Sequence, residues 1–100
     1  MTFTLNTNTK MSLIKDLALR IPDRIRSERL LIEADPIANA KNSMTDPNMQ
    51  LLSKVWFQYI EPHKEASDCP ICLTNIISGF KNLKPHLKEI EKSYQMIKAL

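Results

Sequence analysis

Glycine is scarce in this sequence, and familiar catalytic motifs are missing. Gly79 is the only glycine among the 100 residues. A β-rich domain of this size would need more turn residues, so the scarcity favours helices. A single glycine also cannot form a glycine-rich phosphate loop, and the sequence has neither an HExxH motif nor a GxSxG elbow. The sequence therefore predicts a protein that is not an enzyme.

Long apolar runs are absent as well. No run approaches the roughly 18–20 apolar residues that a membrane span requires. The first ten residues, MTFTLNTNTK, lack the apolar core of a secretory signal. We therefore expect no contact with a membrane and a cytoplasmic location, where the compartment is reducing and a structural disulfide is not expected. The formal net charge of +3 is small and typical of a solvated surface.

The residues that are present indicate one small helical domain. The composition is 43% hydrophobic and 25% charged, as is common for a folded chain. Residues 1–11 are expected to form an extended N-terminal arm, and residues 12–100 a single helical domain. Ser12 is expected to cap a first helix that stops at Pro22. Residues 23–35 predict a second helix, with a strand over residues 29–33 as the alternative, and residues 37–44 fit either a short helix or a linker.

The clearest helix start lies in the middle of the chain. Thr45 and Asp46 precede Pro47, which is the order of a cap residue followed by proline in the first helical turn. The helix that follows is expected to run to Ile60 and to pack against the C-terminal helix. It carries the most apolar face of the sequence, and we expect its aromatic residues to lie in the core: Trp56, Phe57 and Tyr59.

The last third carries a heptad stripe. From Cys69 onward, apolar residues alternate at spacings of four and three, the 3.5-residue period of helices that pack side by side. Pro85 interrupts this segment, so the long C-terminal helix is either kinked or broken near that residue. The predicted fold is all-α, with four to five helices. The predicted interaction stripe consists of Leu73, Ile76, Phe80, Leu83, Leu87, Ile90, Tyr94 and Ile97.

A stripe longer than one small chain can easily cover predicts association between chains. We expect a non-enzymatic structural or interaction protein, without a cofactor, that acts with protein partners in a homo-oligomer or a larger assembly. The alternative is a small basic DNA-binding module, because four clustered arginines near a helix start are placed for phosphate contacts. Acidic residues interleave with them, which favours ion pairs on a solvated face. The arginines are Arg20, Arg24, Arg26 and Arg29.

Both cysteines lie in one tetrapeptide, Cys69-Pro70-Ile71-Cys72. CPICLTNI resembles the opening of a RING finger, although no further cysteine follows. Cys-Pro-x-Cys also resembles the glutaredoxin active site, where a helix N-terminus stabilises a thiolate, although the β-strands of that fold are not indicated here. A third resemblance is to the zinc hook of chromosome-associated DNA-repair ATPases, in which two protomers each supply two thiolates. The long coiled-coil arms of that family are missing.

Several interpretations of the tetrapeptide follow. Zinc would be held by His63, Cys69 and Cys72, or shared between two copies; alternatively, the two thiols would carry out redox chemistry. The simplest interpretation places Ser67 or Asp68 at the helix cap and Pro70 in the first turn. Cys69 is then expected on the buried stripe and Cys72 at its edge, with both thiols reduced and free of metal.

One resemblance spans a longer stretch of the chain. The order of Trp56, Tyr59, Cys69, Cys72 and Phe80 is similar to that of small helical Cys-x-x-Cys proteins of Bacteroidetes bacteria and their phages. This resemblance implies a bacterial host cytoplasm and raises a phage particle, or virion, as the assembly, but it carries no activity and no site residue.

Overall fold

The computed structural model describes residues 7–31 and 35–99, and all secondary structure in these ranges is helical. The prediction of an all-α fold is confirmed for this part of the chain. Two π-helical turns, η1 and η2, directly extend α2 and α4. The elements are α1 (Thr7–Leu19), α2 (Asp23–Ile25), η1 (Arg26–Leu30), α3 (Pro36–Asn39), α4 (Pro47–Val55), η2 (Trp56–Ile60) and α5 (Pro70–Lys98).

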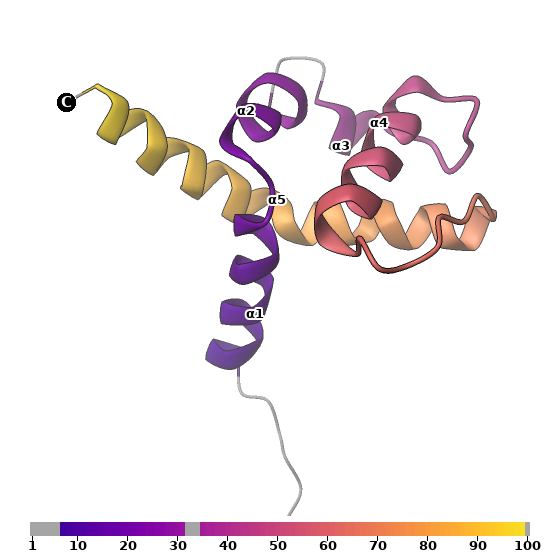
Figure 1. The fold of residues 1–100 in the computed structure, drawn as a ribbon, viewed down its shortest axis with the longest axis horizontal. Coiled ribbons are helices and arrows are strands. Elements are labelled where there is room, and N and C mark those ends of the chain that lie inside the picture. Colours follow the sequence, from indigo (N-terminus) through magenta and orange to yellow (C-terminus); the bar gives the residue numbers. More distant parts are fainter. Residues whose placement is uncertain (1–6, 32–34, 100) are drawn as a thin grey trace, which may run out of the picture.

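The long helix α5 is the element on which the others are arranged. Figure 1 shows α1 meeting the middle of α5 with its C-terminal end, whereas α4 lies beside the first half of α5. The C-terminal end of α5 extends past the other helices. The helix is continuous through Pro85, and its axis changes direction near the middle. A proline inside a helix removes one backbone hydrogen bond, which accounts for a bend there. Of the two alternatives, kinked or broken, the kinked helix is the one observed.

Helix starts at α3 and α4 follow from an aspartate placed before a proline. The Asp46 carboxylate accepts a hydrogen bond from the Met49 N–H at 3.2 Å, and Pro47 is the first helical residue. The predicted start of α4 is therefore confirmed. Asp35 caps α3 in the same way through the Ala38 N–H. Residues 37–44 were expected to form either a short helix or a linker. Both occur, because α3 ends at Asn39 and the residues after it form a loop.

Two helix boundaries were predicted wrongly. The helix α1 begins at Thr7 rather than after Ser12, so residues 7–11 are helical and not an extended arm; the rest of the predicted arm lies outside the described residues. Nothing in that stretch breaks a helix, since it contains neither glycine nor proline. The second helical segment ends at Leu30, earlier than expected, and Asp35 has a positive φ of 39° that a continuous helix cannot contain.

The core forms where α4 and η2 pack against α5, and the predicted contact between these helices is confirmed. The Trp56 ring meets the Phe80 ring edge-on, with centroids 5.4 Å apart. Trp56, Phe57 and Tyr59 are half-buried and pack against the core cluster. The buried apolar residues of this cluster are Ala18, Ile21, Leu30, Ile37, Met49, Leu52, Val55, Ile60, Leu73, Ile76, Ile77, Phe80, Leu83 and Leu87.

Candidate functional site

The predicted interaction stripe on α5 divides into a buried part and an exposed end. Ile90 and Tyr94 are half-buried, whereas Ile97 is 70% exposed and Met96 beside it is also exposed. The stripe loses its cover because α5 continues past the elements that pack on it (Figure 1). The other five members lie in the chain's own core: Leu73, Ile76, Phe80, Leu83 and Leu87.

Arg26 joins η1 to the C-terminal half of α5 through a buried ion-pair network. Its side chain is 1% exposed, its Nε donates to Glu91 Oε2 at 2.8 Å, and its Nη2 donates to Asp23 Oδ1 at 2.7 Å. The guanidinium also lies 5.6 Å from the centroid of the Tyr94 ring. Arg26 is therefore a structural residue, and it is too deeply placed to contact a phosphate as the sequence suggested.

Of the other three arginines, Arg24 and Arg29 line one hollow, but the acidic Glu28 lines it with them. Arg20 donates from Nη1 to the Ile60 carbonyl at 2.8 Å, where it satisfies an end of the η2 segment. Arg24 pairs with Glu28 at 3.2 Å in an exposed i,i+4 ion pair. Arg29 is exposed. The structure thus brings Arg20 to a neighbouring element and pairs Arg24 with an acidic residue, and so gives the DNA-binding alternative less support.

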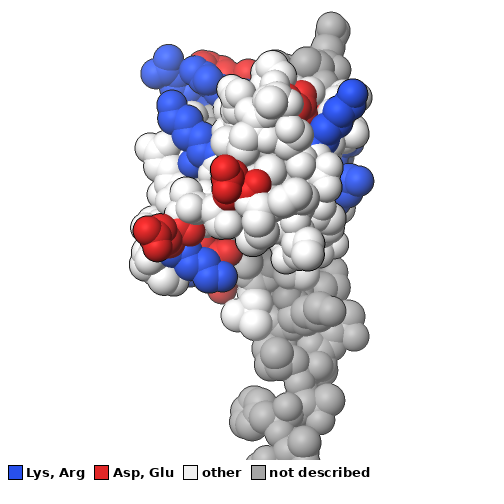
Figure 2. Space-filling model, turned by 90° about the vertical axis from the view of Figure 1, so that its right-hand side faces the viewer, with Lys and Arg blue, Asp and Glu red and all other residues white. Residues whose placement is uncertain are grey.

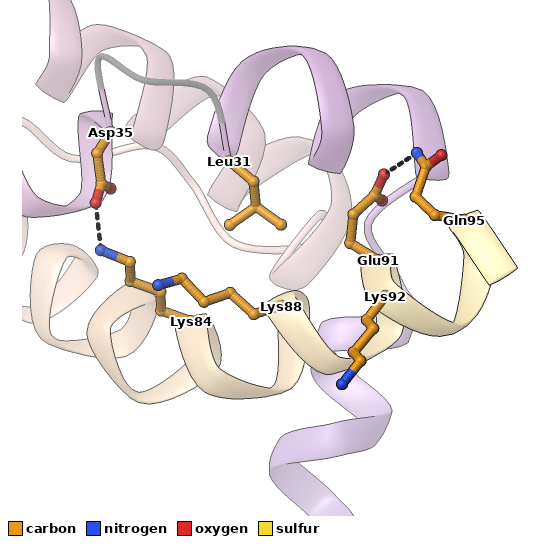
Figure 3. Close-up of a pocket in the computed structure, with 7 residues that line it drawn as sticks. All are labelled: Leu31, Asp35, Lys84, Lys88, Glu91, Lys92 and Gln95. Atoms are coloured by element: carbon orange, nitrogen blue, oxygen red, sulfur yellow. Dashed lines mark hydrogen bonds and ion pairs between the residues drawn. The ribbon is translucent and has the colours of Figure 1, made fainter.

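A cleft of about 420 Å³ lies where Leu31 and Asp35 face α5 (Figure 3). Lys84, Lys88 and Lys92 line it, at the four-residue spacing that places them on successive turns of the helix. Lys84 forms an ion pair with Asp35, and this hydrogen bond holds the pKa of the Asp35 carboxyl below its usual value against the opposing effect of burial.

This cleft is not strongly basic, because acidic partners share it. Figure 3 shows Lys92 turned away from Leu31, while the Glu91 carboxylate, which also lines the cleft, accepts a hydrogen bond from Gln95 at 2.8 Å. The sequence reasoning missed this cleft. The spacing of the lysines was a visible signal, but the approach of Asp35 from 49 positions away had none.

The Cys69-Pro70-Ile71-Cys72 segment forms the first turn of α5. Pro70 is the first helical residue, as expected, but the N-cap is Cys69 rather than Ser67 or Asp68. The Cys72 N–H donates to Cys69 Sγ at 3.1 Å. Cys69 is therefore exposed, and its predicted place on the buried stripe is wrong, because a cap residue lies outside the helical periodicity. Cys72 is half-buried, as expected at the edge of the stripe.

The structure joins Cys69 and Cys72 in a disulfide, so the prediction of two reduced thiols is wrong. Their Cα atoms are 5.2 Å apart, inside the usual range of about 4.4–6.8 Å for such bonds. Residues three apart at a helix start lie on the same side of one turn, which brings the two sulfur atoms together without a change in the backbone. Local geometry therefore permits a bond that the expected compartment argued against.

A second cleft, of about 360 Å³, adjoins this turn. Its apolar wall consists of Trp56, Phe57 and Ile76, and Cys72 lies on the same wall. At its rim, the Glu61 carboxylate accepts a hydrogen bond from Trp56 Nε1 at 2.8 Å and pairs with Lys64 at 3.1 Å. Burial tends to raise the pKa of Glu61, but these two hydrogen bonds outweigh it, and the pKa is lowered.

The predicted alternative zinc ligands do not assemble. His63 lies in the exposed loop between η2 and α5, and the two cysteines are bonded to each other, whereas zinc binds the free thiolate. In residues 7–31 and 35–99, no three His, Cys, Asp or Glu side chains are grouped so that they could hold a metal ion.

Comparison of the chain with protein-family models, with curated proteins and with solved structures finds no significant match. None of the described helices combines the length and apolar composition needed to cross a membrane.

Proposed function

We propose that this chain is an interaction protein that associates with a second copy of itself through the outer end of α5. The observation that carries the proposal is the 70% exposure of Ile97 on a stripe whose first five members are buried. The same heptad spacing that packs the first part of α5 thus continues onto a surface that residues 7–31 and 35–99 do not cover. Self-association of this kind involves no catalytic step.

A second copy is the occupant that fits this surface best. The exposed acidic residue Glu89 lies toward the inner end of the uncovered segment, and Lys98 lies at its outer end. Two such segments packed antiparallel around a two-fold axis would place Lys98 of each copy alongside Glu89 of the other. The apolar residues would then meet along the middle. The further step, that the assembly is a phage particle, rests on the sequence resemblance.

Light scattering on the full chain tests the proposal. We expect a dimer at about 100 µM wild-type protein, a concentration at which even an interface of only micromolar affinity is occupied. Ile97→Glu is expected to give a monomer with an unchanged circular-dichroism spectrum, since the residue is exposed. Ile71→Glu is the matched control, because Ile71 is a 76% exposed isoleucine on the same helix but off the stripe. A monomeric wild type, or a dimer unaffected by Ile97→Glu, would refute the proposal.

The DNA-binding alternative predicts a different result. Salt-sensitive retention of the protein on a DNA column would favour it, because phosphate contacts release counterions. We expect no such retention, since the Arg26 side chain is buried and Arg24 is paired with Glu28.

A further inference from the structure

We propose that the Cys69–Cys72 pair is a thiol–disulfide exchange site for a protein partner that carries two thiols, with the adjoining aromatic cleft as the docking place for an apolar side chain of that partner. This inference goes beyond the proposed self-association and does not depend on it. It rests on three observations: the unequal exposure of the two cysteines, the hydrogen bonds made to their sulfur atoms, and the cleft.

The two cysteines differ in access in the way that exchange requires. Cys69 is exposed at the N-cap, whereas Cys72 is half-buried on the wall of the cleft. An incoming thiolate can therefore reach Cys69 Sγ from solvent. Cys72 lies one helical turn behind it, where it can attack a bond formed at Cys69 but is shielded from bulk reagents.

Both sulfurs have a hydrogen-bond donor that would stabilise negative charge. The Cys72 N–H donates to Cys69 Sγ at 3.1 Å at the N-terminus of a 29-residue helix, where the helix dipole also favours a thiolate. The Ser67 hydroxyl donates to Cys72 Sγ at 3.4 Å. Each sulfur can thus leave as a thiolate when the other is attacked.

The exchange reaction balances without any further reagent. A thiolate of the partner attacks Cys69 Sγ, the Cys69–Cys72 bond breaks, and Cys72 leaves as a thiolate. The second thiol of the partner, once deprotonated, attacks the partner's own sulfur in the mixed disulfide and releases Cys69 as a thiolate. Two electrons pass to this chain, whose two thiolates take up the two protons from the partner's thiols, and the partner is left with a disulfide.

The cleft indicates what kind of partner fits. Its volume of about 360 Å³ is near the lower end of the roughly 300–1,000 Å³ seen for ligand pockets, so it suits a side chain or two rather than a large cofactor. Its wall is apolar at Trp56, Phe57 and Ile76. Figure 2 looks onto the side of the molecule where α5 starts, and there basic and acidic side chains are interspersed with broad uncharged areas. A leucine or a similar residue beside the partner's cysteine is therefore favoured over a strongly charged segment.

A trapping experiment with full-length variants tests the exchange. The probe is a synthetic peptide with a single cysteine, activated as a mixed disulfide with thionitrobenzoate, and with a leucine next to that cysteine. Cys72→Ser keeps the exposed thiol but removes the resolving thiol, so we expect a stable mixed disulfide, detected by mass spectrometry. Cys69→Ser should form it about tenfold more slowly, because Cys72 is shielded. Equal trapping by both variants, or exchange no faster in the folded protein than in the same protein in urea, would overturn the proposal.

A second comparison tests the cleft. We expect a reduced peptide with two cysteine thiols and a leucine beside the first to reduce the wild-type disulfide about tenfold faster than the same peptide with glycine in place of leucine, a ratio typical of partly burying a leucine side chain. Phe57→Ala should remove that preference but leave the rate of reduction by reduced glutathione unchanged. Tyr59→Ala is the matched control, since Tyr59 is a half-buried aromatic on the same η2 segment that lines a different hollow. No leucine preference in the wild type would refute docking in the cleft.

Discussion

At the scale of single residues, Gly79 is present because the Trp56 ring occupies the place of a side chain. A Cβ at this position would lie 2.5 Å from Trp56 Cη2 and 2.7 Å from Cζ3, well inside van der Waals contact. The ring cannot easily yield, since it meets Phe80 on one side and its Nε1 donates to Glu61. The only glycine of the sequence thus allows η2 to approach α5 closely.

Gly79→Ala is expected to destabilise the protein. Alanine would gain about 1 kcal/mol of helix propensity over glycine, but forcing a methyl group into a filled space costs typically 1–3 kcal/mol. We expect the loss to prevail, with a net fall of about 1 kcal/mol in the free energy of unfolding, measured by urea denaturation. Ser78→Ala is the control, because Ser78 is the exposed neighbour on the same helix and should be neutral or slightly stabilising. A stabilised Gly79→Ala protein would show that the Trp56 ring can move aside.

Arg26 gives a second prediction at this scale. Arg26→Leu would leave Glu91, whose side chain is only 15% exposed, without its buried partner. Removing one member of a fully buried ion pair lowers the free energy of unfolding by about 3–5 kcal/mol. We expect a smaller fall for Arg26→Leu, because Asp23, the other partner of Arg26, is half-exposed. Adding Glu91→Leu to Arg26→Leu should recover part of the loss, since the unpaired charge is then gone. Chemical denaturation of the single and double variants measures this; additive losses would contradict the coupling.

At the scale of elements, the Asp35–Lys84 ion pair ties the start of α3 to the middle of α5. The hydrogen bond from Lys84 lowers the pKa of Asp35 below its ordinary value of 3.8 in the folded state. A depressed pKa contributes stability that is present above 3.8 and is lost as the pH falls through the folded-state value. The pair should therefore add to the acid sensitivity of the fold.

Asp35→Asn isolates this contribution. Asparagine can still cap α3 and tolerates the positive φ of 39°, so chiefly the charge is lost. At pH 7 we expect a fall of about 0.5–1 kcal/mol in the free energy of unfolding, because the pair is partly exposed. The difference from wild type should shrink below about pH 3.8, the ordinary pKa given for this carboxyl. Glu28→Gln, in the exposed pair with Arg24, is the control and should show almost no change.

The success of the sequence predictions also differs from element to element. The start of α4 and the course of α5 were readable because Asp46-Pro47 and the heptad stripe are local signals. The place of Cys69 was not, since extending the stripe by one step ignored that a helix beginning at Pro70 makes its predecessor a cap. The cleft beside Cys72 was equally hidden, because Trp56 and Phe57 reach it from a different helix.

At the scale of the whole molecule, α5 serves two purposes along its length. Its first half is the floor of the core, and its second half is held by Arg26 before it passes out of the body of the protein. The burial of Arg26 could not be predicted from the sequence. The sequence shows that four arginines cluster, but only the packing of η1 on α5 shows that Arg26 is buried between the two.

The final prediction concerns the fold after reduction of the disulfide. The Cys69–Cys72 bond closes a loop of only four residues, and closing so short a loop adds about 2 kcal/mol or less in the chain-entropy model. The fold should therefore survive reduction, as a site for reversible exchange requires. Urea denaturation with and without a phosphine reductant measures the difference, and loss of all helical signal in the reductant would contradict the prediction. Placement of Cys69 in the core would make Cys69→Ser costly by about 1–3 kcal/mol. Because Cys69 is an exposed N-cap and serine is a favoured cap, we instead expect Cys69→Ser to match the reduced wild type.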